Sequence, residues 1–76
     1  METPQPFVGI DVSSQRLDVD SLPASHHFSE PNTEDGIASL VLRLRKLNPH
    51  IVLLEATGGY EVPVAYALYE AGPWSL

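Results

Sequence analysis

The sequence contains no cysteine among its 76 residues, and only four of them are lysine or arginine. The lack of cysteine excludes disulfide bonds, thiolate metal sites and a cysteine nucleophile. The four basic residues are outnumbered by ten acidic ones, which gives a formal net charge of −6. Because binding to nucleic acid depends on Lys and Arg neutralising phosphates, this chain by itself is expected to be a poor general binder of DNA or RNA.

Long apolar runs are also missing. No stretch of the sequence approaches the ~20 apolar residues that a helix needs to cross a bilayer. The first six residues carry no basic region of the kind that opens a signal peptide. Hydrophobic residues make up 43% and charged residues 18% of the chain, which is typical of a globular protein. We therefore expect a cytoplasmic protein with no membrane partner.

The amino-terminal half predicts three strands joined by short turns. After an extended lead-in at residues 1–6, Phe7–Val12 is apolar except at Asp11, the pattern of a central strand buried on both faces. Arg16–Leu22 alternates polar and apolar residues, which predicts a half-exposed strand paired with the first. His26–Phe28 predicts a short third strand. The short connections favour an antiparallel meander.

The carboxy-terminal half predicts a helix, a strand and a second helix. Asn32 or Thr33 can cap the first helix, whose apolar residues recur at helical spacing until Asn48 and the following proline end it. In Ile51–Glu55 every residue except the last is apolar, so both faces of the segment are apolar. This pattern predicts a second buried strand. A second helix is expected from about Tyr60 to Ala71. The predicted fold class is α/β: three antiparallel strands, a helix, a parallel strand and a helix.

Two carboxylates stand out against these apolar strands. Asp11 interrupts the first strand and Glu55 closes the helix-connected one. If these strands are parallel neighbours about 4.8 Å apart, both acids lie near the same carboxyl edge of the sheet, where α/β proteins place their sites. Two oxygen ligands at that separation suit Mg²⁺ or Mn²⁺. The alternative, that each acid points into solvent or caps the following turn, stays open from the pattern alone.

Around these acids the chain reads Val-Gly-Ile-Asp-Val-Ser at residues 8–13 and Glu-Ala-Thr-Gly-Gly-Tyr-Glu at residues 55–61. These segments resemble the amino-terminal domain of DEDD transposases, the recombinases of bacterial insertion sequences. That domain has a RuvC-like, ribonuclease-H-type fold. The Glu-Ala-Thr-Gly-Gly-Tyr-Glu run is the specific part of the resemblance, whereas Gly-Ile-Asp-Val is shared with other folds. The similarity extends from Phe7 to Gly72 and is carried by the segments Val8–Ser13, Leu17–Val19 and Leu54–Glu61, followed by Pro63.

The resemblance implies that Asp11 and Glu55 are catalytic residues that bind Mg²⁺ or Mn²⁺. It also implies an enzyme that cuts and rejoins DNA, with DNA and a guiding non-coding RNA as partners of the full-length protein, and a possible homo-oligomer. The family has two further aspartates beyond a fifth strand, and this sequence offers neither. Residues 1–76 are therefore expected to form a partial domain that is inactive alone.

Two alternatives remain. Actin-like and sugar-kinase-type ATPases also begin with a Gly-Ile-Asp strand, but Val12–Gln15 lacks the glycines of their phosphate hairpin. The second alternative is a non-catalytic module that binds a full-length transposase. Elsewhere, Asp18 and Asp20 are interpreted as solvent-facing strand positions, with a role in metal binding as the alternative. Three tyrosines are expected on the second helix, and they are interpreted as packing in the core or at an interface, with base stacking as the alternative. They are Tyr60, Tyr66 and Tyr69.

Overall fold

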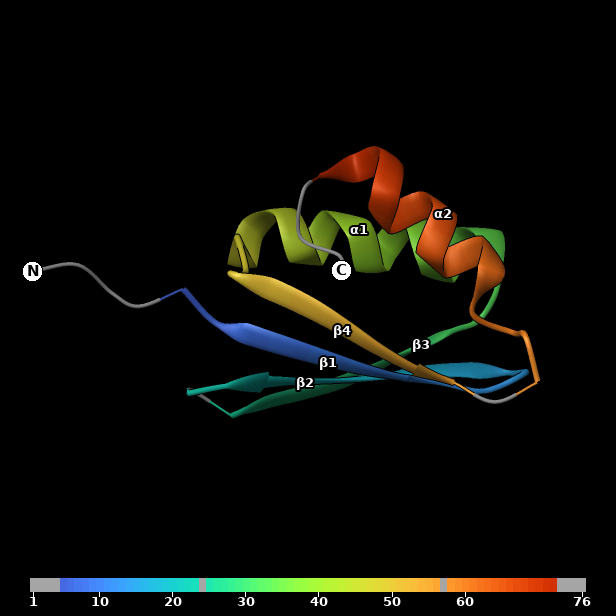
Figure 1. The fold of residues 1–76 in the computed structure, drawn as a ribbon, viewed down its shortest axis with the longest axis horizontal. Helices are drawn as coiled ribbons and strands as arrows, with labels where there is room; N and C mark the ends of the chain where they lie inside the picture. Colours follow the sequence, from blue (N-terminus) through green and yellow to red (C-terminus); the bar gives the residue numbers. More distant parts are fainter. Residues whose placement is uncertain (1–4, 24, 57, 73–76) are drawn as a thin grey trace, which may run out of the picture.

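The structure, a computed structural model, describes residues 5–23, 25–56 and 58–72. The described residues form four strands and two helices in the predicted order, arranged as Figure 1 shows. The third strand is longer than expected, since it continues from His26 to Pro31. The elements are β1 (Phe7–Val12), β2 (Arg16–Leu22), β3 (His26–Pro31), α1 (Glu34–Leu47), β4 (Ile51–Ala56) and α2 (Val62–Ala71).

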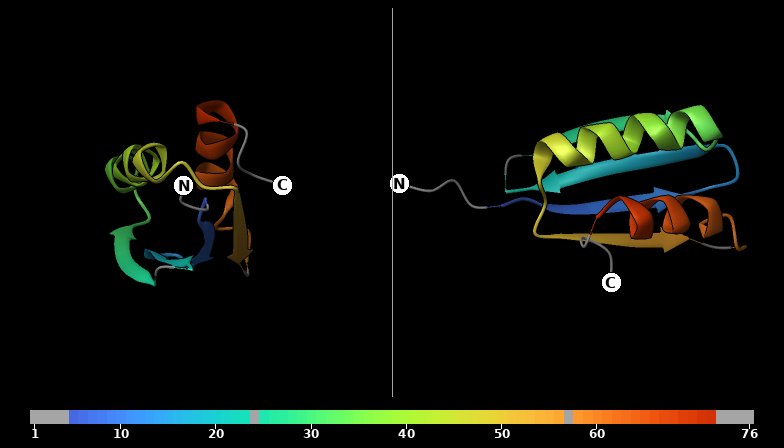
Figure 2. Two further views of the ribbon diagram at one scale, coloured as in Figure 1. Left: turned by 90° about the vertical axis from the view of Figure 1, so that its left-hand side faces the viewer. Right: turned by 90° about the horizontal axis from the view of Figure 1, so that it is seen from above.

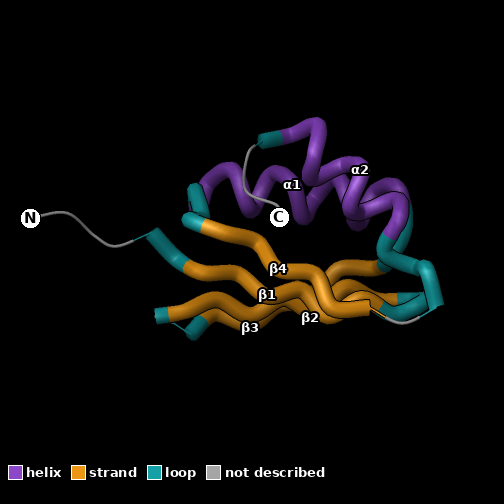
Figure 3. The backbone as a smooth tube through the Cα atoms, in the orientation of Figure 1, coloured by secondary structure: helices purple, strands orange, loops and turns teal. Residues whose placement is uncertain are grey.

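The four strands form one mixed sheet in the order β3-β2-β1-β4 (Figure 3). β1 pairs antiparallel with β2, and β2 pairs antiparallel with β3. β4 returns on the other side of β1 and runs parallel to it, which is the usual arrangement when a helix connects two neighbouring strands. The predicted α/β class and strand directions are confirmed.

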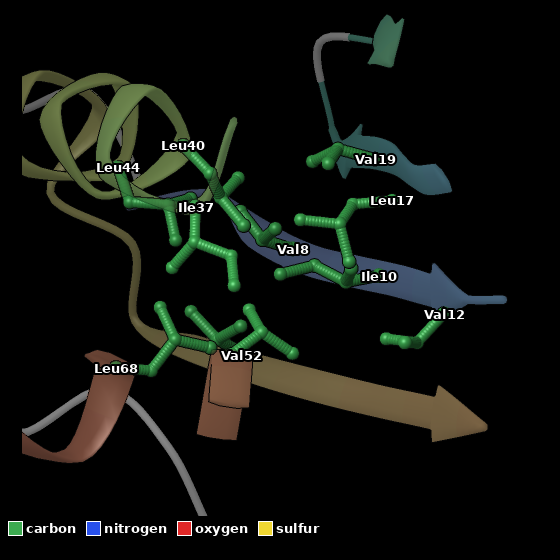
Figure 4. Close-up of a cluster of buried hydrophobic side chains, with 11 residues drawn as sticks. Val8, Ile10, Val12, Leu17, Val19, Ile37, Leu40, Leu44, Val52 and Leu68 are labelled. Carbon is green, nitrogen blue, oxygen red and sulfur yellow. The ribbon is translucent and has the colours of Figure 1, made fainter. Parts of the chain in front are cut away.

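Both helices cover the same face of the sheet, α1 toward β3 and α2 toward β4 (Figure 2). The core lies between them and the sheet (Figure 4). Neither described helix has the length and apolar character needed to cross a membrane. The buried core side chains are Val8, Ile10, Val12, Leu17, Val19, Ile37, Leu40, Leu44, Val52, Val64 and Leu68.

The expectation that β1 and β4 are buried on both faces is wrong. Alternate residues of β1 are exposed, including Asp11, and the Phe7 side chain is 56% exposed. On β4, Leu53 is 46% exposed. The reason is that both helices lie over one face, so the other face has no covering layer within the described residues. We call it the open face; its acids are in contact with solvent.

Local signals set the ends of α1 as expected. Thr33 is the amino-terminal cap, and its hydroxyl oxygen accepts a hydrogen bond from the Gly36 N–H at 3.1 Å. Asn48 adopts a left-handed conformation at the carboxyl end, and its N–H donates to the Leu44 carbonyl at 2.8 Å. The second helix starts at Val62, with a proline in its first turn.

The tyrosines of the second helix do not pack in the core. Tyr66 is 67% exposed and Tyr69 is 79% exposed. Of the two predicted roles, core packing is therefore wrong for these residues, and packing at an interface stays a prediction. Tyr60 lies in the loop before α2, not on the helix. α2 buries only Val64 and Leu68 fully, because a single short helix presents one narrow stripe to the sheet.

Replacing Gly36 with alanine is expected to destabilise the chain by about 2 kcal/mol, because a Cβ there would overlap the Pro31 carbonyl oxygen where α1 crosses β3. This loss outweighs the gain of about 1 kcal/mol that alanine brings to a helix interior. Urea unfolding followed by circular dichroism measures the change. Gly9→Ala is the control, since no atom lies within 4 Å of its added Cβ. Equal stability of the Gly36 variant and wild type would contradict the close approach.

Candidate functional site

The parallel pairing of β1 and β4 brings Asp11 and Glu55 together. The two residues are direct Cα partners in the register, and neighbouring strands run about 4.8 Å apart. Partners in a sheet point to the same face, and both side chains are exposed. The structure therefore places the two acids that stand out in the sequence side by side at the carboxyl end of the open face.

A third carboxylate extends this pair into a row. Asp18 on β2 is the antiparallel partner of Asp11, so Glu55, Asp11 and Asp18 lie across three adjacent strands. We call these three residues the acid row. The alternation of the strand indicates a solvent-facing Asp18, with metal binding as the alternative, but it does not place Asp18 beside Asp11. The sequence of the turn could have indicated this pairing. In an antiparallel hairpin whose turn sets Ser13 opposite Arg16, Asp11 lies opposite Asp18, because each of the two aspartates is two residues further from the turn.

The charges of the acid row are unevenly compensated. Asp18 Oδ1 accepts a hydrogen bond of 2.5 Å from Ser29 Oγ, and Asp18 Oδ2 lies 3.6 Å from Arg16 Nη2. Within the described part of the chain, Asp11 and Glu55 have no side-chain hydrogen bond or ion pair. Like charges directly opposite each other destabilise a sheet, so this end of the row is a favourable place for a cation.

The donor set suits a hard divalent cation that keeps water ligands. Mg²⁺ is commonly held through one or two carboxylates, with water completing its octahedron. Asp11 and Glu55 supply two such carboxylates from rigid strands. Among the residues that the structure describes, no three His, Cys, Asp or Glu side chains are placed to hold one ion together. The two acids therefore fit an open, hydrated magnesium or manganese site, not an all-protein cage.

Comparisons with known proteins assign no family to this geometry. No family model matches the chain, and no curated protein matches it either.

Asn32 connects the two loops that follow the candidate ligands. Its backbone N–H donates to the Gln15 carbonyl at 2.9 Å. Its side-chain nitrogen donates to the Ser13 carbonyl at 2.8 Å and to the Tyr60 carbonyl at 3.3 Å. The turn after β1, the entry to α1 and the loop after β4 are thereby tied together. Asn32 was a candidate helix cap in the sequence; its positioning role depends on contacts that only the folded chain makes.

The other polar side chains of the open face form a separate group. Asp20 lies opposite Gly9 and His27 in the register. His27 Nδ1 is 2.9 Å from Asp20 Oδ1. Asp20 therefore has a partner of its own and does not belong to the acid row. As interpreted from the sequence, it faces solvent.

The basic residue Arg43 is engaged in packing at the far side of the sheet. Its guanidinium carbon lies 4.3 Å from the centre of the Phe28 ring. Its Nε is 3.3 Å from Glu30 Oε2. Arg16 lies at the end of the acid row, where its Nη2 is 3.6 Å from Asp18 Oδ2.

Proposed function

We propose that this chain is the amino-terminal part of a RuvC-like, ribonuclease-H-type transposase domain. The complete domain would cut and rejoin DNA with Mg²⁺ or Mn²⁺ held in part by Asp11 and Glu55. The observation that carries the proposal is the register of β1 and β4, in which these two acids are direct partners. The mixed sheet, with its three antiparallel strands and one parallel strand, supports it.

Each residue of the site has a distinct part in this proposal. Asp11 and Glu55 hold the metal, and a divalent cation supplies stabilisation of the negative charge that develops on a phosphate under attack. Asp18 is held by Ser29 and Arg16, so it adds negative potential beside the site from a fixed position. Asn32 keeps the two loops at this edge in place.

The DNA partner must be held mainly by other parts of the protein. A chain with a net charge of −6 repels phosphate at low salt, and Arg43 is committed to Phe28 and Glu30. Within the proposal, the full-length protein and a guiding non-coding RNA provide the DNA contacts. The 76-residue chain contributes two of the four expected acids and is expected to be inactive alone.

The gene tests the family assignment directly. Reading the coding DNA in frame beyond Leu76 is expected to reveal a further strand and a close pair of aspartates. These residues would complete the set of four acids. A frame that continues without an acidic pair, or that stops and is followed by unrelated sequence, would contradict an intact transposase domain.

An actin-like or sugar-kinase-type ATPase is less well supported. Phosphate hairpins bind through free backbone N–H groups. In the turn after β1, the Ser13 N–H donates to the Arg16 carbonyl at 2.9 Å, and the Arg16 N–H donates to Ser13 Oγ at 3.1 Å. Both donors are therefore already used within the turn. A non-catalytic module that binds full-length transposase is distinguished by co-purification with that protein.

A further inference from the structure

The loop that follows Glu55 has an uncommon backbone conformation. Gly58 and Gly59 both have a φ of 79°, in the left-handed region that is costly for any residue with a Cβ. An added Cβ at Gly58 would also lie 3.0 Å from the Tyr60 ring, so this ring closely approaches the loop backbone. The two glycines therefore allow the chain to turn sharply just after a candidate ligand.

This turn brings the Tyr60 carbonyl to the Asn32 side chain, at the end of the molecule where α1 begins (Figure 1). Asn32 Nδ2 donates to the Tyr60 carbonyl at 3.3 Å and to the Ser13 carbonyl at 2.8 Å. A side-chain amide has two donor hydrogens, so one asparagine can bind both carbonyls at once. Ser13 follows Asp11 closely and Tyr60 follows Glu55. We call this pair of hydrogen bonds the Asn32 bridge; it joins the segments that come after the two candidate ligands.

The two segments that the bridge joins are not held equally well by their own hydrogen bonds. In the turn after β1, the Ser13 N–H donates to the Arg16 carbonyl at 2.9 Å. In the loop after β4, the Val62 N–H donates to the Gly59 carbonyl at 3.5 Å, which is long for a hydrogen bond and therefore weak. Glu55 is the last residue but one of β4. The bridge therefore matters more for the position of Glu55 than for the turn after β1.

We propose that Asn32 is a positioning residue of the metal site and that it acts through Glu55. This inference rests on the metal site of the proposed function. Groups that fix the ligands of a metal raise its affinity, because less order has to be imposed when the ion binds. Without the bridge, the loop after β4 gains conformations in which the Glu55 carboxylate points away from Asp11. The Gly-Gly-Tyr turn then has a structural purpose: it delivers the carbonyl that Asn32 binds.

The affinity for Mn²⁺ tests the bridge, measured by electron paramagnetic resonance of the unbound ion at a temperature where circular dichroism shows every variant to be folded. Asn32→Ala is expected to raise the dissociation constant about three- to tenfold, less than the roughly 10–100-fold typical of a group bonded directly to a ligand. Thr33→Ala is the matched control. This neighbouring residue loses the hydrogen bond from the Gly36 N–H that caps α1, and its variant is expected to bind Mn²⁺ like wild type.

A double-mutant cycle with Glu55→Gln shows whether Asn32 acts through this ligand. The effects of two residues that act through one another do not add, whereas those of independent residues do. Glu55→Gln alone is expected to weaken Mn²⁺ binding at least about tenfold, and Asn32→Ala in that background is expected to cause no further loss. A general effect of Asn32 on the fold would instead weaken binding by the same factor in both backgrounds.

Three outcomes would overturn the inference. If Asn32→Ala binds Mn²⁺ like wild type while Glu55→Gln binds it more weakly, the bridge has no part in metal binding and the metal site itself stands. Equal losses in both backgrounds, or an equal loss in Thr33→Ala, would show that Asn32 acts through the stability of the fold and not through Glu55. Wild-type binding that does not depend on Glu55 would instead remove this residue from the proposed metal site, and the positioning role with it.

Discussion

Asp11→Asn is expected to remove most of the stabilisation that Mn²⁺ gives to this protein, while leaving the metal-free chain slightly more stable than wild type. The two effects have opposite signs for one physical reason. Without a cation, the Asp11 carboxylate faces like charges on both neighbouring strands. With a cation, the same carboxylate becomes a ligand. If Asp11 were a surface aspartate with no part in metal binding, the effect of its substitution on stability would not change sign when metal is added.

Thermal unfolding with and without Mn²⁺ measures both effects. A ligand at ten times its dissociation constant stabilises the folded state by about 1.4 kcal/mol, or roughly 6–11 °C for a domain of this size. We expect this shift in wild type and its loss in Asp11→Asn and Glu55→Gln. The metal-free Asp11 variant should unfold at a temperature equal to or a few degrees above that of wild type.

Asp20→Asn is the charge-matched control for the metal experiment. Asp20 lies on the same open face, but it faces Gly9 and His27 and not the acid row. Its variant also loses one negative charge, so it reports the general effect of charge on Mn²⁺ association. An equal loss of the Mn²⁺ shift in the Asp20 and Asp11 variants would contradict a site at Asp11 and Glu55.

Leu40→Ala is expected to leave the chain largely unfolded at 25 °C. Leu40 is completely buried between α1 and the sheet, and truncation of a buried leucine to alanine costs about 2–5 kcal/mol. The whole chain has only roughly 3–5 kcal/mol of net stability to lose, as is usual for a single core of this size. One cavity therefore removes most or all of the stability.

Urea titration followed by circular dichroism at 222 nm gives the free energy of unfolding for this comparison. Leu42→Ala is the matched control, since the same residue type lies two positions away on α1 and is 61% exposed. Its variant is expected to stay within about 0.5 kcal/mol of wild type. A Leu40 variant that unfolds at the same urea concentration as the Leu42 variant would contradict the position of the core.

The metal and core experiments act on opposite faces of one sheet. On β1, Ile10 is buried beneath the helices while the adjacent Asp11 is exposed on the other face, because successive strand residues point to opposite sides. A change at Asp11 therefore alters charge without opening a cavity. Loss of the metal shift in a folded Asp11 variant can thus be assigned to the site itself.

The order of the elements and the two ends of α1 could be predicted because the forces that set them are local. The period-two alternation of Arg16–Leu22 and the helical spacing that includes Leu40 and Leu44 describe one face of each element. Thr33 and Asn48 act on backbone groups within four residues of themselves. The adjacency of Asp11 and Glu55 also followed from the pattern, because a strand connected through a helix is expected to run parallel to its partner.

What escaped prediction depends on residues far apart in the chain. Phe7 and Leu53 suggested strands buried on both faces, yet hydrophobicity cannot tell on which side of the sheet each connecting helix passes. In the folded protein both pass over one face, which exposes Asp11 and leaves Tyr66 in solvent. The Asn32 contacts with Ser13 and Tyr60 likewise join segments separated by up to 28 positions. Patterns along the chain specify the helices, the strands and the caps. Which face of the sheet the helices cover is decided by the packing of the whole molecule, because that packing brings together residues that are far apart in the sequence.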